Sequence, residues 1–529
     1  MASRAHPYHT FLVAAAPALA IFVHNVGQMA THEVWPSLGV GVLLAAAFLA
    51  GGRLLTGDMR RGGILASLAL LLFFSHGHLQ AELRHAHLGP PMLWANRYLI
   101  PAGVLLVVLA GIALARTRRR FDKFTTILNL TAALLVALQV GQIGLYKARA
   151  ALSYRTLAPA REILAAPPAG EARTRPDIYY IIMDRYPNER CLAEFYGFDN
   201  GPFLDSLRSR GFYVASESHS NYIDSAHSLA SSLNMEYLDR LGPPARLLPT
   251  DWIPLFELIA DNRVARALTE LGYRFIHFGS SWPPTVRNPH AFRNVNFIRM
   301  KEYDRILWSH TAAQPLLDTL GLADVFEEKQ VLVERHFAEI AKLAEDPEPT
   351  YAFAHFLLPH APYVFDETGR HLAPVDRKRI GETERFVGQL RYANTRLMAL
   401  VDTLLSRSPD PPIIILQGDE GPYPEGWEPS VSFIELPDAE LRHKSSILNA
   451  LLLPGASPER LYPGISPVNT FRLVLKEYFA AHIDFLPDQV YAFPNFQHLY
   501  ELTDVTERVR ETGDEQRTDS GSLEGTSGR

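Results

Sequence analysis

The sequence has few of the features that mark a disulfide scaffold or a nucleic-acid-binding protein. Cysteine occurs once, at Cys191, so no intrachain disulfide can form. The formal net charge is −6, whereas nucleic-acid-binding domains usually present a basic face, so no nucleic-acid partner is predicted. A chain of 529 residues is long enough for more than one domain and for a large core that needs no disulfide.

Charged residues are scarce in the first 149 residues, and long apolar runs take their place. A transmembrane helix needs roughly 20 predominantly apolar residues. Five segments reach or approach that length, at about 11–26, 36–55, 63–79, 99–115 and 125–146. Residues 1–149 are therefore predicted to form a five-helix transmembrane domain, integral to a membrane.

The loops between these segments carry an uneven distribution of Lys and Arg. Arg53, Arg60 and Arg61 lie at the junction of the second and third segments, and residues 116–123 between the fourth and fifth are also basic. The loop after the first segment has no Lys or Arg. The positive-inside rule then predicts a multi-pass protein of the cytoplasmic membrane with a cytoplasmic N-terminus. After five spans, everything from residue 150 is predicted to lie outside the cytoplasm.

The remainder of the chain reads as a soluble α/β domain. Residues 150–175 are rich in Ala, Pro and Arg, which indicates a juxtamembrane helix and linker. From 176 to 504, strand-like and helical patterns alternate, which predicts a mostly parallel central sheet covered by helices. Residues 505–529 are polar and are predicted to be a disordered tail.

Two apolar strand patterns end in carboxylates. Residues 178–183 precede Asp184, and residues 413–416 lead through Gln-Gly to Asp419 and Glu420. Open α/β sheets bind ligands at the carboxyl ends of their strands. Adjacent carboxylates repel each other unless a cation lies between them. A solvated Asp-Glu turn is the alternative interpretation.

Small and hydroxyl-bearing residues lead into a helical pattern at Ser225, with Asp224 or Ser225 as the N-cap. A helix N-terminus offers free N–H groups and the positive end of the helix dipole, which suit a phosphate or sulfate. The alternative is a serine that only caps the helix.

In this order, strand-Asp184, helix-start Ser225, the Pro-His-Ala-Pro segment containing His360, and Asp419-Glu420-Gly421 resemble the alkaline phosphatase/sulfatase superfamily. The nearest branch is membrane-anchored and similar to lipoteichoic acid synthases and phosphoethanolamine transferases. The resemblance covers about residues 176–500. It implies an alkaline phosphatase/sulfatase-like α/β fold behind the membrane domain.

The resemblance also implies a metal site. Asp184 and Asp419 fall on metal-ligand positions, and Ser225 falls on the position of a metal-bound nucleophile. Glu420 stands where relatives usually place His or Asn, and we include it among the candidate ligands. Carboxylate oxygens favour one divalent Mn, Mg or Ca ion, with Zn left open.

Sulfatases form formylglycine from a Cys or Ser that is followed by Pro two residues on and by Arg four residues on. Here those two positions hold His227 and Leu229. The resemblance therefore implies an unmodified serine nucleophile at Ser225, activated by the neighbouring cation.

Basic residues complete the implied site. His360 would face the leaving group, where an imidazolium can stabilise charge or protonate the alkoxide. The basic turn at 442–444 is either an anion contact, as in relatives, or a solvated turn. The candidate substrate-binding residues are His355, Arg442, His443, Lys444 and His277.

The resulting prediction is a membrane-anchored, extracytoplasmic, metal-dependent phosphotransferase. It would move a phospho-headgroup from a phospholipid or other anionic ester through a covalent serine intermediate. The acceptor would be a hydroxyl of a cell-envelope glycan or lipid. The alternatives are a phosphodiesterase or sulfuric-ester hydrolase on the same scaffold, and a catalytically inactive membrane receptor that binds anions.

Overall fold

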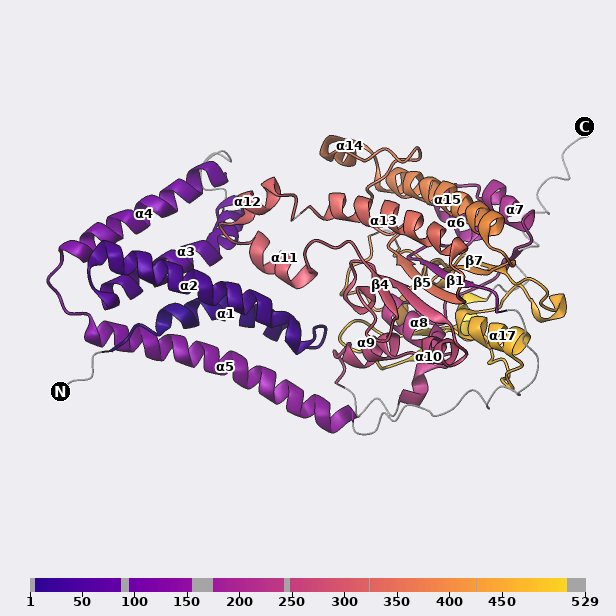
Figure 1. Cartoon of the computed structure of the whole chain (residues 1–529), viewed down its shortest axis with the longest axis horizontal. Helices are drawn as coiled ribbons and strands as arrows, with labels where there is room; N and C mark the ends of the chain where they lie inside the picture. The colour runs from indigo at the N-terminus through magenta and orange to yellow at the C-terminus, as the bar shows by residue number, and fades with distance from the viewer. Residues whose placement is uncertain are drawn as a thin grey trace, which may run out of the picture. The chain divides into compact units, whose positions relative to one another are not determined.

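The computed structural model describes residues 5–86, 95–154, 175–241, 248–322, 324–424 and 426–510. The chain forms two compact units (Figure 1). The helical unit contains residues 1–153 and 299–325, and the sheet unit contains residues 154–298 and 326–529. Most of the predicted linker (155–174) and most of the predicted tail (511–529) lie outside the described residues.

Five consecutive helices form the N-terminal part of the helical unit: α1 His9–His24, α2 Val34–Thr56, α3 Met59–His85, α4 Asn96–Arg116 and α5 Asp122–Tyr154. Among the described residues, α2 to α5 are long and apolar enough to cross a membrane. Helix α1 has 16 residues, about 24 Å at 1.5 Å per residue against a hydrocarbon thickness of about 30 Å. The predicted count of five spans is therefore one too high.

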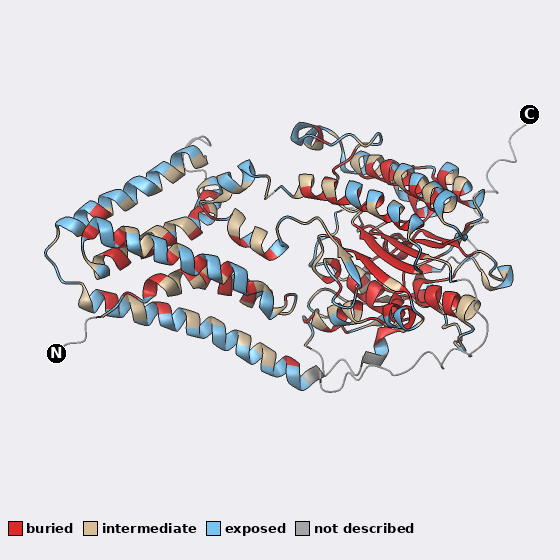
Figure 2. Cartoon of the chain, viewed as in Figure 1, coloured by how far each residue is buried: buried red, intermediate tan, exposed pale blue. Residues whose placement is uncertain are grey.

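Several polar side chains inside the helical unit form hydrogen bonds within it. His9 Nδ1 lies 2.7 Å from Ser67 Oγ, and the His9 backbone N–H donates to Asn129 Oδ1 at 2.8 Å. His76 Nε2 lies 2.9 Å from Asn96 Oδ1. Such pairing is what a low-dielectric surrounding requires of buried polar groups. Many apolar residues of α2, α4 and α5 are exposed (Figure 2).

A seven-stranded sheet organises the sheet unit, in the order β2-β7-β6-β1-β5-β3-β4. Strands β1, β3, β4, β5 and β6 are parallel, while β7 runs antiparallel to β6 and to β2. Their bounds are β1 Ile178–Met183, β2 Tyr213–Val214, β3 Arg274–Phe278, β4 Arg293–Val295, β5 Thr350–Phe356, β6 Ile413–Gly418 and β7 Asn449–Leu452. The predicted helical domain followed by a mostly parallel α/β domain is confirmed.

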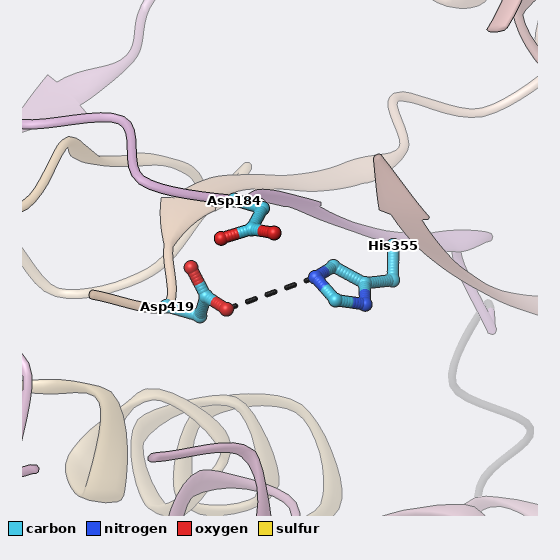
Figure 3. Close-up of side chains that lie close together, drawn as sticks. All are labelled: Asp184, His355 and Asp419. Atoms are coloured by element: carbon cyan, nitrogen blue, oxygen red, sulfur yellow. Dashed lines mark ion pairs between the residues drawn. The ribbon is translucent and has the colours of Figure 1, made fainter. Parts of the chain in front are cut away.

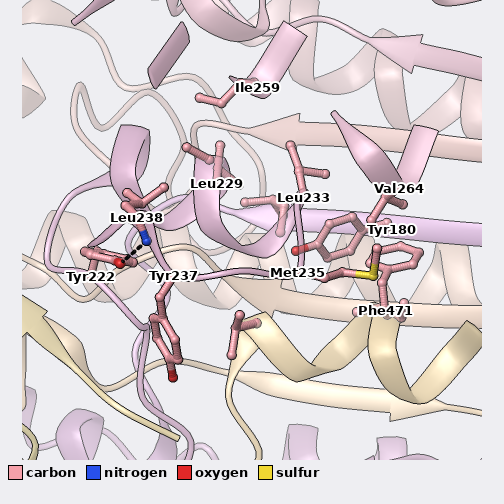
Figure 4. Packing of buried hydrophobic residues seen from close by; sticks show 14 of the residues in the cluster. Tyr180, Tyr222, Leu229, Leu233, Met235, Tyr237, Leu238, Ile259, Val264 and Phe471 are labelled. Carbon is pink, nitrogen blue, oxygen red and sulfur yellow. Dashed lines mark hydrogen bonds between the residues drawn. The ribbon is translucent and has the colours of Figure 1, made fainter. Parts of the chain in front are cut away.

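Both faces of the sheet are buried, which explains the unbroken apolar runs of its central strands. Along β1, Ile178, Tyr180 and Ile182 join one hydrophobic core, and the alternate residues join the other. The first core packs against α8 Ser225–Ser232, α9 Ile253–Ala260, α10 Arg263–Glu270 and α17 Pro467–Phe479 (Figure 4). The second packs against α6 Glu189–Tyr196, α7 Gly201–Arg208, α13 Val325–Lys342 and α15 Glu382–Arg407.

The remaining elements are short. Helices α11 Glu302–Ser309 and α12 Gln314–Thr319 lie in the helical unit. The sheet unit also contains α14 Pro374–Arg379, α16 Asp438–Ser445, α18 Thr506–Val509 and a small ribbon of β8 Tyr491–Ala492 with β9 Thr503–Asp504.

Candidate active site

Three neighbouring parallel strands bring the candidate metal ligands to one edge of the sheet. In the registers of β1 with β5 and β6, Ile182 lies opposite His355 and Met183 opposite Gly418. Asp184 and Asp419 follow their strands directly, and His355 is the penultimate residue of β5. The strand order therefore places all three side chains at the carboxyl ends of adjacent strands.

Asp184, His355 and Asp419 form a buried cluster whose ligand atoms all lie within 4.8 Å of one another (Figure 3). The three side chains are at most 4% exposed. Asp184 Oδ1, His355 Nε2 and Asp419 Oδ2 have no hydrogen-bond partner, although His355 Nε2 is 3.7 Å from Asp419 Oδ2. Buried polar atoms without partners are costly, and a cation among these three would satisfy them all. The donor set fits a divalent metal ion.

Thr285 orients the His355 ring. His355 Nδ1 lies 2.9 Å from Thr285 Oγ1, which in turn lies 2.7 Å from Ser280 Oγ. The Trp282 ring packs edge-on against the imidazole. When one ring nitrogen of a histidine is held by an outer partner, the other is presented to a metal. His355, predicted to contact substrate, instead lies among the candidate metal ligands.

The two aspartates have opposite pKa shifts. Burial, together with the charge of Asp419, raises the pKa of Asp184 well above its ordinary value. Burial also acts to raise the pKa of Asp419, but His355, the Ser225 hydroxyl and the Arg185 N–H outweigh it and leave that pKa lowered. Two adjacent carboxylates that cannot both be charged behave in this way, and a cation would allow both to ionise.

Ser225 is the first residue of α8 and lies beside the cluster. The Asp224 side chain caps the helix by accepting from the Ala226 N–H at 2.9 Å. Asp224 supplies the cap, and the Ser225 hydroxyl lies close enough to Asp419 to help lower the pKa of that carboxylate. Ser225 is half-buried, so an external substrate can reach it at a helix N-terminus suited to anions.

Glu420 turns away from the cluster toward two cations. Its carboxylate lies 2.8 Å from Lys444 Nζ and 3.1 Å from Arg185 Nε. Lys444 is fully buried and also donates to the Gly421 carbonyl. Burial raises the pKa of Glu420 to about 7, against the opposing effect of Lys444 and Arg185. The structure thus places both predicted site residues, Glu420 and Lys444, in a buried ion pair.

Arg185 was not singled out from the sequence, yet it connects the two carboxylate groups. Its backbone N–H donates to Asp419 Oδ1 at 3.2 Å while its side chain reaches Glu420. The guanidinium lies over the Tyr423 ring, 4.2 Å from the centroid. The backbone of Arg185 has a φ of +60°, a left-handed conformation that costs a non-glycine residue about 1 kcal/mol. No local sequence signal identifies an arginine held in this way.

His360 is held near the cluster by its backbone. Its N–H donates to the Asp184 carbonyl at 3.2 Å, and Lys329 Nζ donates to the carbonyls of His360 and Pro362 at 2.5 and 2.9 Å. Gln389 donates to the His360 carbonyl as well. Burial, followed by the charges of Arg185 and Lys329, lowers the His360 pKa well below its usual value. The ring is therefore neutral in this state, in contrast to the imidazolium expected from the sequence.

The other predicted substrate-binding residues lie apart from the cluster. Arg442 and His443 line a cavity of about 670 Å³ between α6 and the loop after β2, and the His443 ring stacks on Phe195. His277 is 2% exposed, lies 2.9 Å from the Thr285 carbonyl and stacks on Phe353. The structure therefore brings Asp184, Ser225, His355, His360 and Asp419 together, and leaves Arg442, His443 and His277 outside that group.

No protein-family model matches this sequence, and no curated protein matches it. Among solved structures, the chain is similar to the integral membrane protein lipooligosaccharide phosphoethanolamine transferase A from Neisseria meningitidis, with 12% identity and a TM-score of 0.39, over 89% of this chain and 94% of that one. It is also similar to the C-terminal periplasmic domain of EcEptC from Escherichia coli in complex with Zn, with 12% identity and a TM-score of 0.42; the match covers 64% of this chain and 94% of that one. The chain is similar as well to a protein in the alkaline phosphatase superfamily from Vibrio parahaemolyticus, with 13% identity and a TM-score of 0.38; the match covers 65% of this chain and 79% of that one.

Proposed function

We propose that this chain is a membrane-anchored, metal-dependent phosphotransferase that moves a phospho-headgroup from a lipid to an acceptor hydroxyl through a covalent Ser225 intermediate. One observation carries the proposal. Three buried ligand atoms without partners, on Asp184, His355 and Asp419, converge beside a half-buried serine at a helix N-terminus. The order of the sequence motifs, which resembles the alkaline phosphatase/sulfatase superfamily, supports the same reaction class.

Asp184, His355 and Asp419 would hold one divalent ion. Two carboxylates with one imidazole suit Zn or Mn as well as the harder Mg and Ca, so His355 widens the range of metals that the sequence alone favoured. When bound, the ion supplies Lewis acidity at the ester oxygens and lowers the pKa of the Ser225 hydroxyl. Glu420 is proposed as a counter-ion to Lys444 and Arg185, because its carboxylate already faces both.

In the first half-reaction, Ser225 loses its proton to solvent and its Oγ forms a bond to phosphorus. The bond from phosphorus to the lipid alcohol breaks, and the departing alkoxide takes a proton from His360. The His360 ring becomes charged only once an anionic diester lies beside it, because burial otherwise keeps its pKa low. The N-terminus of α8 stabilises the charge on the nonbridging oxygens.

In the second half-reaction, the acceptor hydroxyl gives its proton to His360 and its oxygen bonds to phosphorus, while the bond to Ser225 Oγ breaks. His360 returns to its charged form, and the Ser225 alkoxide regains from solvent the proton that it lost in the first half-reaction. The same steps with water as acceptor give a phosphodiesterase. The donor is expected to be a phospholipid, since the candidate spans α2–α5 would hold the chain in a bilayer. The topology predicted from the basic loops would put the donor at the outer surface of the cytoplasmic membrane.

The test uses the full chain in detergent micelles, a headgroup-labelled phospholipid, a chromogenic phosphodiester and an aryl sulfate. Wild type is compared with Ser225→Ala and with Ser228→Ala, which removes a buried hydroxyl from the same helix. We expect phosphodiester cleavage that is lost with a chelator, restored by one divalent metal, abolished in Ser225→Ala and kept in Ser228→Ala. Turnover of the aryl sulfate alone, or equal activity of both variants, would contradict the proposal.

A further inference from the structure

Residues 299–325 leave the sheet unit between β4 and α13 and pack within the helical unit. They form α11 and α12. Residues 306–317 contain no Asp, Glu, Lys or Arg. This uncharged stretch is too short to span a bilayer, and its length is typical of a core helix or of a re-entrant or interfacial segment.

Side-chain contacts hold α11 against the N-terminal helices. The Tyr303 hydroxyl donates to the Ala18 carbonyl of α1 at 2.8 Å. Trp308 Nε1 donates to Ser37 Oγ at 3.0 Å, and Ser37 Oγ donates to Asp304 Oδ1 at 2.6 Å. Tyr303 and Leu307 are buried in the same apolar cluster as residues of α1, α2 and α3.

Backbone hydrogen bonds fix the turn between α11 and α12 to α3. The Gly77 N–H donates to the His310 carbonyl, and the Ala312 N–H donates to the Phe73 carbonyl. A side chain at Gly77 would overlap the backbone of His310, since an added Cβ would lie 2.7 Å from its carbonyl oxygen. Glycine at position 77 therefore permits this close approach.

The depth of these contacts follows from the length of α3. Phe73 and Gly77 stand 12 and 16 residues after Arg61, which is about 18 and 24 Å along the helix. Ser37 stands 16 residues before Arg53 on α2, also about 24 Å. With the arginines at the cytoplasmic boundary of a core about 30 Å thick, the contacts fall in its outer part.

Apolar side chains of this segment point away from the helical unit. Leu316 and Leu320 are 60% and 57% exposed, and Ile306 is 42% exposed. These values match Leu105 and Leu109 on the outward face of the candidate span α4, at 58% and 55%. Neighbouring exposed leucines beside the spans suit lipid chains.

We infer that residues 299–325 form a second membrane attachment, with α11 and α12 seated in the outer leaflet and Ile306, Leu316 and Leu320 in contact with lipid. Lipid chains of the bilayer would cover this surface. The sheet unit would then be tied to the membrane by its own chain at residues 299–325 as well as by the connection after α5. This inference does not depend on the reaction that the site performs.

Site-directed spin labelling of the full chain in phosphatidylethanolamine–phosphatidylglycerol vesicles tests the inference. The background is Cys191→Ser, with single cysteines at Leu316, Leu320, Leu105 as a lipid-facing reference, and Val375. Val375 lies on α14 in the sheet unit and is 68% exposed, which makes it the aqueous reference.

We expect labels at 316 and 320 to collide more with dissolved oxygen than with a water-soluble nickel chelate, as at 105, with the reverse order at 375. Because all four positions are exposed, the substitutions should leave the fold intact. Ile306→Cys gives a second test from α11. Greater access of the nickel chelate at 306, 316 and 320, matching position 375, would overturn the inference, whatever the catalytic activity of the preparation.

Discussion

Replacing Lys444 with methionine removes the cation that faces Glu420 while keeping the length of the side chain. Lys444 is 0% exposed and Glu420 is 1% exposed, and their charged atoms lie 2.8 Å apart. Breaking a buried pair by removing one partner typically costs about 3–5 kcal/mol, because the other charge is left uncompensated. Arg185 retains its contact with Glu420 at 3.1 Å, so we expect the lower part of that range, about 3 kcal/mol.

The stability lost in Lys444→Met should depend on pH, and the direction of that dependence follows from the pKa of Glu420. The folded-state pKa of Glu420 is raised from 4.5 to about 7, so the folded state holds a proton that the unfolded state has already released. Stability from this group therefore falls as pH rises from 4.5 to about 7. Without Lys444 the pKa rises further and the penalty continues to grow above pH 7. Lys444→Met should thus be less destabilising at pH 5 than at pH 8.

Thermal unfolding of the full chain in detergent, after chelator treatment, measures the effect. The sheet unit contains residues 154–298 and 326–529. At roughly 2.1 cal/mol/K per residue for a unit of about 350 residues, a loss of about 3 kcal/mol lowers the Tm by about 4 °C. Lys444→Met/Glu420→Met should recover most of the loss, since a buried ion pair can often be replaced by apolar groups. Lys342→Met is the control, because Lys342 lies on the surface with its side chain 68% exposed. A Tm for Lys444→Met within 2 °C of the control would refute the reasoning.

Three further predictions concern the metal, the His360 loop and the second attachment. Asp184→Asn and His355→Gln should each lose bound metal after dialysis, by elemental analysis, while Glu420→Gln keeps it; equal loss in all three would return Glu420 to the ligand set. Lys329→Met should lower kcat about tenfold with little change in KM, because the carbonyls of His360 and Pro362 lose their donor; unchanged kcat would deny a positioning role. A piece spanning residues 175–510 should aggregate without detergent, and replacing residues 299–324 with a Gly-Ser linker should restore a monodisperse species; equal solubility of both would argue against lipid contact.

The convergence of Asp184 and Asp419 could be predicted because each follows a run of apolar residues long enough to be a buried strand. Parallel strands end at one edge, so their terminal carboxylates meet there. The position of Ser225 at a helix start could also be predicted from local capping chemistry. Both inferences need only a few neighbouring residues.

The metal-facing position of His355 could not be predicted in the same way. It depends on β5 lying next to β1 with Ile182 opposite His355, and on Thr285 holding the other ring nitrogen. The pairing of Glu420 with Lys444 joins residues 24 positions apart, and Lys329 approaches from α13. Contacts of this kind arise from tertiary packing and leave no periodic or local trace.

The packing of residues 299–325 also could not be predicted from the sequence. The sequence shows that residues 306–317 carry no Asp, Glu, Lys or Arg, but it offers no sign that this segment packs against Phe73 and Gly77 of α3. The neighbouring strand β4 has three residues, too few for a periodic pattern to identify.

Direct detection of the covalent intermediate tests the central claim. The full chain would be incubated with a phospholipid donor and the activating metal, quenched in acid, digested and examined by mass spectrometry. The account predicts a phospho-headgroup adduct on the peptide containing Ser225, absent with a chelator and absent in Ser225→Ala. Turnover that continues undiminished in Ser225→Ala, or an adduct on another residue, would contradict it.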